Sequence, residues 1–407
     1  MKHFFKRLFL IFICLAVLVA GVGMTPFKKP GDNLPYPEMA AQAIREALQD
    51  AGLTYSDVQD VYAGYVYGDS ASGQRAVYEV GMTGVPVINV NNNCSSGSTA
   101  LYMARKAVAN GSADCALAVG FEQMPAGALR AYWDDRPDPL DHFNGVMDEI
   151  FGHPELPMAI RYFGAAGREH MERYGTPLDT FARIRAKASR HAARNPLALF
   201  RKEVTVEEVL ASSPLVPGAM TRLMACPPTC GAAAAVFVSK KFAQKMGLSA
   251  NVQVLAQSLV SDRPGAFADK SAISVVGFDM TREAARQVYE AAGVGPQDID
   301  VCELHDCFAQ NELLSYEGLG FCAVGEGRAF VESDSNTYGG AVVVNPSGGL
   351  LSKGHPLGAT GLAQCYELTH QLRGSAEARQ VEGARLALQH NAGLGGATVV
   401  TLYGRAD

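Results

Sequence analysis

One segment of about twenty residues occurs twice in the chain. Residues 39–58 read MAAQAIREALQDAGLTYSDV, and residues 280–299 read MTREAARQVYEAAGVGPQDI. Gly52 aligns with Gly293 and Asp57 with Asp298, at the same offset of 241 residues. Each copy predicts an amphipathic helix that ends at glycine, then a short turn into a strand. A chain that contains such a repeat is expected to fold as two similar halves.

The segments that follow the two copies are also alike. Each half continues with an apolar strand, a loop rich in small residues, a helix and a closing strand. In the first half these elements are expected at 85–90, 99–110 and 113–121, and in the second at 341–344, 362–372 and 384–391. Alternating strands and helices predict an α/β protein with two mostly parallel sheets packed together.

The stretch between the halves, residues 122–224, differs in character. It contains the single tryptophan, Trp133, and a basic helical segment at 183–194. We interpret this stretch as an inserted loop domain. Its basic residues, Arg183 and Arg185 among them, either line a site for a phosphorylated ligand or form an ordinary solvated helix face.

Composition limits the classes of protein that the chain can belong to. With 407 residues, 48% of them hydrophobic and 19% charged, it can build more than one core and is not disordered. A net charge of −6 argues against nucleic acid as the main partner.

The nine cysteines are an odd number in a long chain, which indicates free thiols instead of a disulfide framework. The candidate ligands for a zinc site are Cys226, Cys230, Cys302, His305 and Cys307. Their spacings match no paired C-x-x-C pattern, so no metal is expected.

The first twenty residues admit two interpretations. Lys2, Lys6 and Arg7 precede an apolar run at 8–20, as in a signal peptide or a short membrane anchor. Alternatively, residues 16–23 form the first core strand. Contact with a membrane is expected only under the first interpretation, and we favour the strand.

Two residues stand out as candidates for chemistry. Cys94 lies between an expected strand and an expected helix, after three asparagines and before Ser95. This position directs free backbone N–H groups and the positive end of the helix dipole at the sulfur, which favours the thiolate. His355 lies in the Gly-rich loop GGLLSKGHPLGATG, where an imidazole can take and return a proton.

Two further loops carry reactive or donor groups. His305 and Cys307 follow the strand expected at 300–304, and strand ends are where sites form in α/β sheets. The Gly-rich turn at 390–396 can supply backbone N–H groups to an oxyanion. The duplication predicts that all four loops emerge at equivalent ends of the two halves.

These motifs resemble a known family over nearly the whole chain, from about residue 19 to residue 403. The sequences VNNNCSSGSTALYMAR, ELHDCFAQNELLSYEGLG, NPSGGLLSKGHPLGATGLAQC and ALQHNAGLGGATVVTLY are similar to those of the sterol-carrier-protein-type 3-ketoacyl-CoA thiolases, represented by the thiolase domain of sterol carrier protein x. In that family the segment at 21–27 belongs to the first core strand, which is why we favour a strand there.

The resemblance implies a thiolase fold with two duplicated halves packed as layered sheets and an inserted loop domain. The implied boundaries are an N-terminal extension (1–18), a first half (19–121 with 225–262), the loop domain (122–224) and a second half (263–407). It also implies a homodimer. The compartment would be the cytoplasm in a bacterium, or the peroxisomal or mitochondrial matrix in a eukaryote.

The resemblance also implies roles for residues. Cys94 would be the acylated nucleophile, and His355 would activate Cys94 and take part in an oxyanion hole. His305 would bind the thioester oxygen, and Cys307 would be the second acid–base group. Backbone N–H groups of Cys94 and Gly393 would form an oxyanion hole. Acyl-CoA and CoA would be substrates, with no permanently bound cofactor.

Departures and alternatives remain. His390 stands where most thiolases have their second cysteine, and Cys230 stands where related sequences tend to have Asp. The implied reaction is thiolysis of a 3-ketoacyl-CoA in lipid or sterol side-chain degradation. The alternatives are a biosynthetic Claisen condensation, a steroid side-chain retro-aldolase on the same fold, and a non-catalytic lipid-binding protein.

Overall fold

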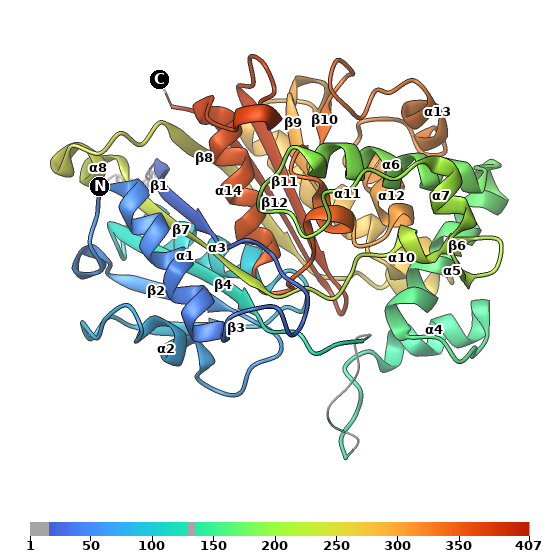
Figure 1. The fold of residues 1–407 in the computed structure, drawn as a ribbon, viewed down its shortest axis with the longest axis horizontal. Coiled ribbons are helices and arrows are strands. Elements are labelled where there is room, and N and C mark those ends of the chain that lie inside the picture. Colours follow the sequence, from blue (N-terminus) through green and yellow to red (C-terminus); the bar gives the residue numbers. More distant parts are fainter. Residues whose placement is uncertain (1–15, 128–132, 134, 407) are drawn as a thin grey trace, which may run out of the picture.

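The computed structural model describes residues 16–127, 133 and 135–406. Two halves with the same order of elements make up most of it (Figure 1). The first half contains β1 (Val17–Met24), α1 (Tyr36–Ala51), β2 (Asp60–Gly64), β3 (Val87–Val90), α3 (Ser96–Ala109), β4 (Cys115–Glu122) and β7 (Gly231–Ser239). The second contains β8 (Val252–Val260), α11 (Phe278–Ala292), β9 (Val301–Glu303), β10 (Val343–Val344), α14 (Thr360–Arg373), β11 (Leu386–Gly393) and β12 (Ala397–Arg405).

The duplicated segments form equivalent elements, as expected. They fold as α1 and α11, and each helix ends at a glycine in the left-handed conformation, with φ of 68° at Gly52 and 70° at Gly293. A short 3₁₀ turn and a strand follow in both halves. The strand order is also the same, β1-β7-β4-β2-β3 in one half and β8-β12-β11-β9-β10 in the other.

The expectation of two mostly parallel sheets needs correction. Only the pairs β2–β3, β2–β4, β9–β10 and β9–β11 are parallel, and the inner strands β1, β7, β8 and β12 pair antiparallel. One reason is that a tight turn joins β11 to β12, and such a turn permits only antiparallel pairing. Pairing of β1 with β8 joins the halves into one ten-stranded hydrogen-bonded sheet.

The helices divide the molecule into layers. Buried residues of α3 and α14 share one hydrophobic cluster with strands of both halves, so these two helices lie between the sheets of the halves. Helix α1 packs on the outer face of the first half and α11 on that of the second. This arrangement brings the N-terminal end of α3 close to the loop before α14.

Strand β1 confirms the strand expected at residues 16–23. Its side chains alternate between two cores, with Val17 and Val19 in one and Leu18 and Ala20 in the other. A strand that is buried on both faces has no polar positions, which is why its sequence resembles the apolar run of a signal peptide. The proposed boundary at residue 19 falls inside this strand, and residues 1–15 lie outside the described part of the chain.

Additional elements complete the chain. Between β4 and β7, in the stretch assigned to a loop domain, lie α4 (Asp141–Phe151), α5 (Met158–Tyr174), α6 (Leu178–Ala193), α7 (Val206–Ala211), β5 (Pro214–Val216) and β6 (Met220–Thr221). The others are α2 (Ser72–Val77), α8 (Lys240–Met246), α9 (Gly265–Ala268), α10 (Ala272–Val275), α12 (Ala309–Gly318) and α13 (Gly327–Glu332). The helices between β4 and β7 share a core with the second half.

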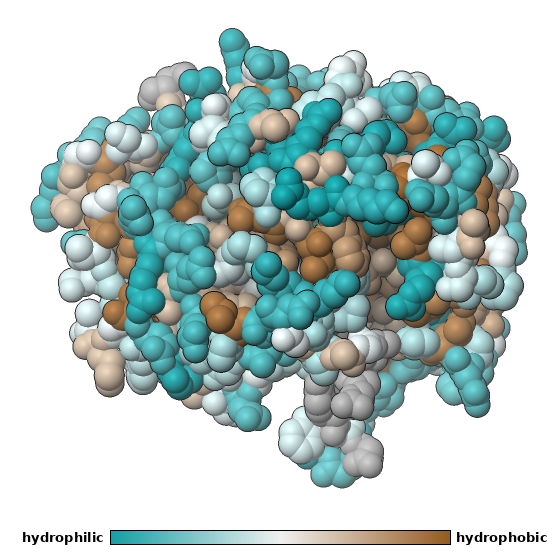
Figure 2. All heavy atoms as spheres, in the orientation of Figure 1, coloured by the Kyte–Doolittle hydropathy of each residue, from teal (hydrophilic) through white to brown (hydrophobic). Residues whose placement is uncertain are grey.

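The surface and the cysteines give two further observations. On the face shown in Figure 2, hydrophobic side chains form small groups among hydrophilic ones. Among residues 16–127, 133 and 135–406, no helix has both the length and the apolar character that spanning a bilayer requires. The eight cysteines of this part are free thiols, as expected; Cys14 lies outside it.

Candidate active site

Four loops from the two halves meet around one cavity of about 620 Å³. They are the β3–α3 turn, the loop after β9, the loop before α14 and the turn after β11. The predicted residues Cys94, His305, Cys307, His355 and Gly393 all line this cavity. The sulfur of Cys94 and one ring nitrogen each of His305 and His355 lie within 4.8 Å of one another.

A tight turn fixes Cys94 at the start of α3. Asn93 adopts a left-handed φ of 51°, and the hydroxyl of Ser96 accepts from the N–H of Asn92 (2.9 Å) and donates to the carbonyl of Asn93 (2.7 Å). Burial raises the pKa of the Cys94 thiol to about 12, with the charge of Glu122 as a further cause and the backbone N–H of Cys94 opposing both.

The expectation that Cys94 favours the thiolate is therefore wrong. The thiol is buried, so the loss of solvation outweighs the favourable field at the helix start. Cys94 must give its proton to a neighbouring base during attack.

His355 is positioned to be that base. The Thr360 hydroxyl donates to the carbonyl of Pro356 (3.0 Å), so it has no proton left for the ring and must accept from Nδ1 of His355 (2.7 Å). This leaves Nε2 with its lone pair, buried and without a hydrogen-bond partner. Burial, helped by the charge of Lys353, lowers the pKa of His355 to about 3, so the ring is neutral and Nε2 carries no proton.

His305 faces the same cavity with a different set of partners. Its Nδ1 lies 2.9 Å from the side-chain amide nitrogen of Asn391, and its ring is perpendicular to that of His355 with the centroids 5.0 Å apart. Burial first, then the neighbouring His355 and His390, holds the pKa of His305 well below its ordinary value. Two neutral imidazoles thus face Cys94.

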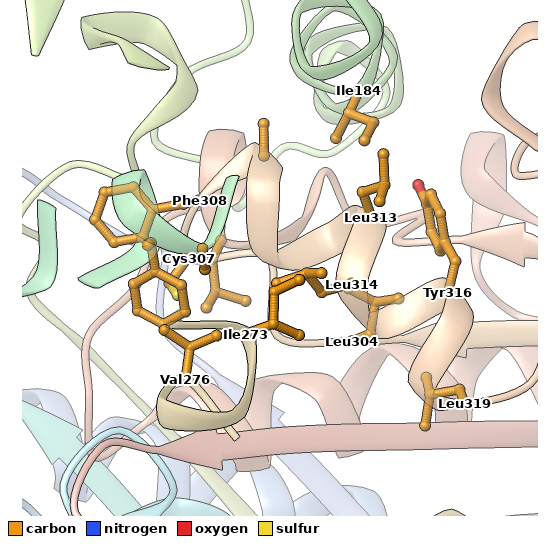
Figure 3. Close-up of a cluster of buried hydrophobic side chains, with 14 of the residues drawn as sticks. Ile184, Ile273, Val276, Leu304, Cys307, Phe308, Leu313, Leu314, Tyr316 and Leu319 are labelled. Atoms are coloured by element: carbon orange, nitrogen blue, oxygen red, sulfur yellow. The ribbon is translucent and has the colours of Figure 1, made fainter. Parts of the chain in front are cut away.

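Cys307 and Cys226 bring two more thiols to the cavity. The N–H of Cys226 donates to the carbonyl of Cys307 (2.9 Å), so the two lie opposite each other in a short antiparallel bridge. Burial raises the pKa of Cys307 well above its ordinary value, and this thiol is therefore a proton donor at neutral pH. Figure 3 shows Cys307 beside Phe308, Ile273 and Val276 at one end of an apolar cluster.

Gly393 lies directly against the turn that carries Cys94. A Cβ at Gly393 would lie 2.2 Å from the carbonyl oxygen of Asn92, so only glycine permits this approach. The side-chain amide of Asn93 donates to the carbonyl of Leu394 (3.2 Å), which ties the two loops together. The structure thus places both expected oxyanion groups, at Cys94 and Gly393, on one side of the cavity.

The two basic candidates of the loop domain lie in different places. Arg185 is buried, lines the cavity and donates to the hydroxyl of Ser352 (2.6 Å), and burial lowers its pKa to about 10. Arg183 is exposed and pairs with Asp179 at 3.4 Å outside the cavity. Lys29 and Arg222 also line the cavity, and sequence analysis did not single them out.

The alternative zinc set does not assemble. In the part of the chain that is described, the cluster of potential metal ligands is Cys94, His305 and His355. Of the residues set aside as zinc candidates, Cys230 and Cys302 lie outside the cavity lining. The ring of His355 is neutral and its Nε2 has no hydrogen-bond partner, so the same three groups can also carry out nucleophilic and acid–base chemistry.

The two departures from the family pattern lie behind the cavity. His390 is buried against Thr281 (2.9 Å) and accepts from the backbone N–H of His305 (3.4 Å), so it supports the loop that carries His305. Cys230 is buried with its thiol 3.5 Å from the carbonyl of Met124. Nothing in the structure explains why a thiol stands at position 230.

Comparison with known proteins agrees with this geometry. The family models for "Thiolase, N-terminal domain" and "Thiolase C-terminal domain-like" match residues 17–241 and 267–405. The chain belongs to the thiolase family. It is 55% identical to sterol carrier protein 2 of Oryctolagus cuniculus and 53% identical to that of Homo sapiens, in both cases over 95% of this chain and 71% of the relative.

More distant thiolases show the same relationship. The benzoylsuccinyl-CoA thiolase subunit BbsB of Thauera aromatica is 35% identical over 93% of this chain and 95% of that protein. Human mitochondrial 3-ketoacyl-CoA thiolase has the same fold, with a TM-score of 0.73 at 17% identity over 97% of this chain and all of the other. An aldolase complex, Ltp2-ChsH2(DUF35), also shares the thiolase fold, with a TM-score of 0.81 at 23% identity over 97% of this chain and 98% of that one.

Proposed function

We propose that this thiolase is a CoA-dependent acyltransferase that cleaves 3-ketoacyl-CoA to acetyl-CoA, or propionyl-CoA, and a shortened acyl-CoA. The observation that carries the proposal is the convergence of a buried thiol and two neutral imidazoles within 4.8 Å, with the Cys307 thiol lining the same cavity. A nucleophile, a base, an oxyanion donor and a second acid are the four groups that this reaction requires.

In the first half-reaction Cys94 gives its proton to Nε2 of His355, and its sulfur attacks the 3-keto carbon. Backbone N–H groups of Cys94 and Gly393 would hold the resulting oxyanion. The carbon–carbon bond then breaks. The enolate oxygen accepts a hydrogen bond from His305, and the enolate carbon takes the proton of Cys307.

In the second half-reaction the thiol of CoA gives its proton to the Cys307 thiolate and attacks the acyl group on Cys94. The Cys94 thiolate leaves and takes back the proton from His355. All four groups return to their starting protonation states, as a ping-pong cycle requires. The same steps in reverse give Claisen condensation, and we propose degradation as the physiological direction.

The lining of the cavity supports an apolar acyl group. One wall consists of side chains without polar groups, including Phe143, Ile160, Phe163, Val276 and Phe308. The substrates we propose are medium-to-long, branched or sterol side-chain 3-ketoacyl-CoA thioesters. Burial of such a chain stabilises the complex by about 25 cal/mol per Å² of apolar surface.

Arg185 supports the proposal that CoA is the second substrate. Its guanidinium is buried at the cavity and bonded to the Ser352 hydroxyl. Such a group favours an anionic or strongly accepting ligand. Replacing Arg185 with Met is expected to raise the KM for CoA with little change in kcat, whereas replacing the exposed Arg183 is expected to change neither.

The test is CoA-dependent loss of a panel of 3-ketoacyl-CoA thioesters with the parent protein and Cys94→Ala. We expect turnover by the parent and loss of about 10³-fold or more in the variant. Mass spectrometry after mixing with an acyl-CoA should show a thioester on Cys94. Undiminished turnover in Cys94→Ala would contradict the mechanism.

The same experiment separates the alternatives. A retro-aldolase would cleave a 3-hydroxyacyl-CoA without acylating a cysteine, and a lipid-binding protein would neither cleave the panel nor carry a thioester. The buried Cys94–His355 pair argues against both, because neither activity requires an acylated thiol. The resemblance in fold to an aldolase complex concerns the fold alone.

We also propose that the enzyme is a homodimer that associates through β3. This strand ends the sheet, and its residue Ile88 is 42% exposed, near Tyr78 at 49% and Met82 at 78%. An edge strand with exposed apolar residues favours pairing with a second copy. The strand at the other end of the sheet, β10, is short and buried. Ile88→Lys is expected to convert a dimer to a monomer in light scattering.

For the compartment, we propose a reducing one: the cytoplasm of a bacterium, or the peroxisomal or mitochondrial matrix of a eukaryote. Eight free thiols, one of them the nucleophile, support this proposal.

A further inference from the structure

A chain of buried hydrogen bonds leads from the core of the second half to His305. The hydroxyl of Tyr403 donates to Oε1 of Gln389, and the amide nitrogen of Gln389 donates to the carbonyl of Gly361 (2.7 Å) and to the hydroxyl of Ser98 (2.9 Å). The Gly361 carbonyl can only accept, so the orientation of the Gln389 amide is fixed. Both amide protons of Gln389 are then in use.

The next two bonds follow from proton counting. Ser98 accepts from Gln389, so its single proton is donated to Oδ1 of Asn391 (2.8 Å). The amide nitrogen of Asn391 must therefore face Nδ1 of His305, at 2.9 Å. Since that nitrogen is a donor, Nδ1 of His305 is an acceptor, and a neutral ring carries its proton on Nε2.

Burial makes this orientation stringent. Ser98, Gln389 and Asn391 are fully buried, and His305 nearly so. Rotating the Asn391 amide would place two donors face to face at Ser98 and leave the Ser98 proton without an acceptor, which is costly for fully buried groups. This chain of hydrogen bonds joins the two halves of the molecule. Ser98 lies in α3 of the first half and Asn391 in β11 of the second, 293 residues further along the sequence.

We propose that Asn391, oriented by Ser98 and Gln389, is a positioning residue that holds His305 with its proton on Nε2, so that His305 donates a hydrogen bond to the substrate's thioester oxygen. This inference rests on the proposed thiolase function. His355 is held in the opposite state by Thr360, with its lone pair on Nε2. His305 thereby acts as the hydrogen-bond donor and His355 as the base.

The groups that face His305 are histidines and thiols, and next to it in the chain is the buried carboxyl of Asp306, whose pKa burial raises to about 8. Those from other elements are His355, His390 and Cys94, and Cys307 lies on its own loop. The pKa values of both neighbouring histidines are lowered and those of both thiols are raised, all by burial. Asp306 is present in both the parent and the Asn391→Asp variant, so dividing one kcat by the other removes its effect and isolates the charge introduced at position 391.

The decisive variant is Asn391→Asp. The aspartate side chain has nearly the same shape as asparagine, but toward Nδ1 of His305 it presents a hydrogen-bond acceptor in place of the amide donor. The new carboxylate is expected to raise the pKa of His305. Below that pKa the ring is an imidazolium and still donates from Nε2. Above it the remaining proton moves to Nδ1, and Nε2 can no longer donate.

The expected result is therefore a new alkaline limb in the pH profile. We expect the ratio of kcat in Asn391→Asp to kcat in the parent to fall about 100-fold between pH 6 and pH 9. This is the usual effect of losing one oxyanion donor. The KM should change little. Asn391→Ala should show a smaller loss with no new limb. A merely structural role would give the same loss at every pH, and that result would overturn the proposal.

A second measurement needs no turnover and so separates this proposal from the proposed function. The measurement is a ¹⁵N NMR spectrum of the parent protein labelled at its histidines. The signals of His305 are assigned by comparison with His305→Asn. At pH 7 they should show that the His305 proton lies on Nε2. A proton on Nδ1 overturns the inference even if the protein is an active thiolase. A proton on Nε2 without thiolase turnover supports the inference about the chain of hydrogen bonds and contradicts the function instead.

Discussion

The rings of His305 and His355 lie perpendicular to each other with their centroids 5.0 Å apart, and their partners give them opposite proton arrangements. Nδ1 of His305 accepts from Asn391, whereas Nδ1 of His355 donates to Thr360. One ring therefore presents a proton to the cavity and the other a lone pair. In the proposed mechanism the lone pair of His355 takes the Cys94 proton, and the proton of His305 binds the substrate oxygen.

The Thr360 hydroxyl is expected to be necessary for this arrangement. Thr360→Val keeps the shape of the side chain but removes the acceptor for Nδ1 of His355, so the ring loses its preference for a free Nε2. We expect kcat to fall about 10- to 100-fold, because only a fraction of the molecules then has His355 in the tautomer with an unprotonated Nε2. Steady-state kinetics on a 3-ketoacyl-CoA measures the effect.

Thr360→Ser is the matched control, since it keeps the hydroxyl. It should retain kcat within about threefold of the parent. Equal losses in the serine and valine variants would mean that packing of the Thr360 methyl group, and not its hydroxyl, is what supports His355.

The Cys307 thiol should matter more for cleavage of the carbon–carbon bond than for acyl transfer to Cys94. Cys307→Ala removes the group that protonates the enolate, so cleavage of the carbon–carbon bond is expected to slow about 10²- to 10⁴-fold. Transfer of an acyl group from a simple acyl-CoA to Cys94 involves no enolate, and its leaving group, the CoA thiolate, is a stable enough anion to depart without the Cys307 proton. Mass spectrometry should therefore still show the thioester on Cys94 in this variant.

Loss of both activities together in Cys307→Ala would contradict this division. It would indicate that Cys307 also positions Cys94, or that the cavity has collapsed. Thermal unfolding of the variant distinguishes the two outcomes.

The sequence predicts the candidate reactive groups because each of them has a recognisable local context. Cys94, His305, Cys307 and His355 each follow a recognisable strand or precede a helix, and the duplication predicts that their loops meet. The folded structure places all four on one cavity. The sequence does not predict the protonation state of Cys94. Burial raises the pKa of its thiol, and burial depends on residues far away in the chain.

The supporting groups were missed for the same reason. In the sequence Asn391 is only one member of a Gly-rich turn, and its hydrogen-bond partner Ser98 is 293 positions away. Thr360 lies five residues from His355 in the motif GHPLGATG, a spacing that could have suggested the contact. Cys226 was considered only as a zinc ligand, and nothing local shows that it faces Cys307.

Close contact between β4 and the loop of His355 should make Gly120 intolerant of a side chain. A Cβ at Gly120 would lie 2.0 Å from the carbonyl oxygen of Gly358. Since the obstacle is backbone, Gly120→Ala is expected to lower the free energy of unfolding by about 1–3 kcal/mol and to reduce kcat through displacement of His355. Chemical denaturation and kinetics measure the two effects.

Gly145 provides the control within the same chain. It lies in α4, and a Cβ there would meet no atom within 4 Å. Gly145→Ala should raise the free energy of unfolding by about 0.5–1 kcal/mol because alanine favours the helix. If both variants destabilised equally, the contact at Gly358 would not be the cause.

Asp262 should make the stability of the enzyme depend on pH. Its Oδ1 is buried without a hydrogen-bond partner, and burial raises the pKa of this carboxyl to about 6. Between the unfolded pKa, near 3.9, and pH 6 the folded protein keeps a proton that the unfolded chain has lost. The folded state therefore loses relative stability as the pH rises through this range, and above it the full cost of the buried charge is present.

Asp262→Asn removes that charge and should abolish this part of the pH dependence. The midpoint temperature of the variant, compared with that of the parent, is expected to rise between pH 4 and pH 7. The gain should be limited to about 1 kcal/mol, because Asp262 is partly exposed and solvent screens its charge. A constant difference between the two proteins across this range would show that the Asp262 carboxyl titrates at its ordinary pKa, and that water reaches it in the folded state.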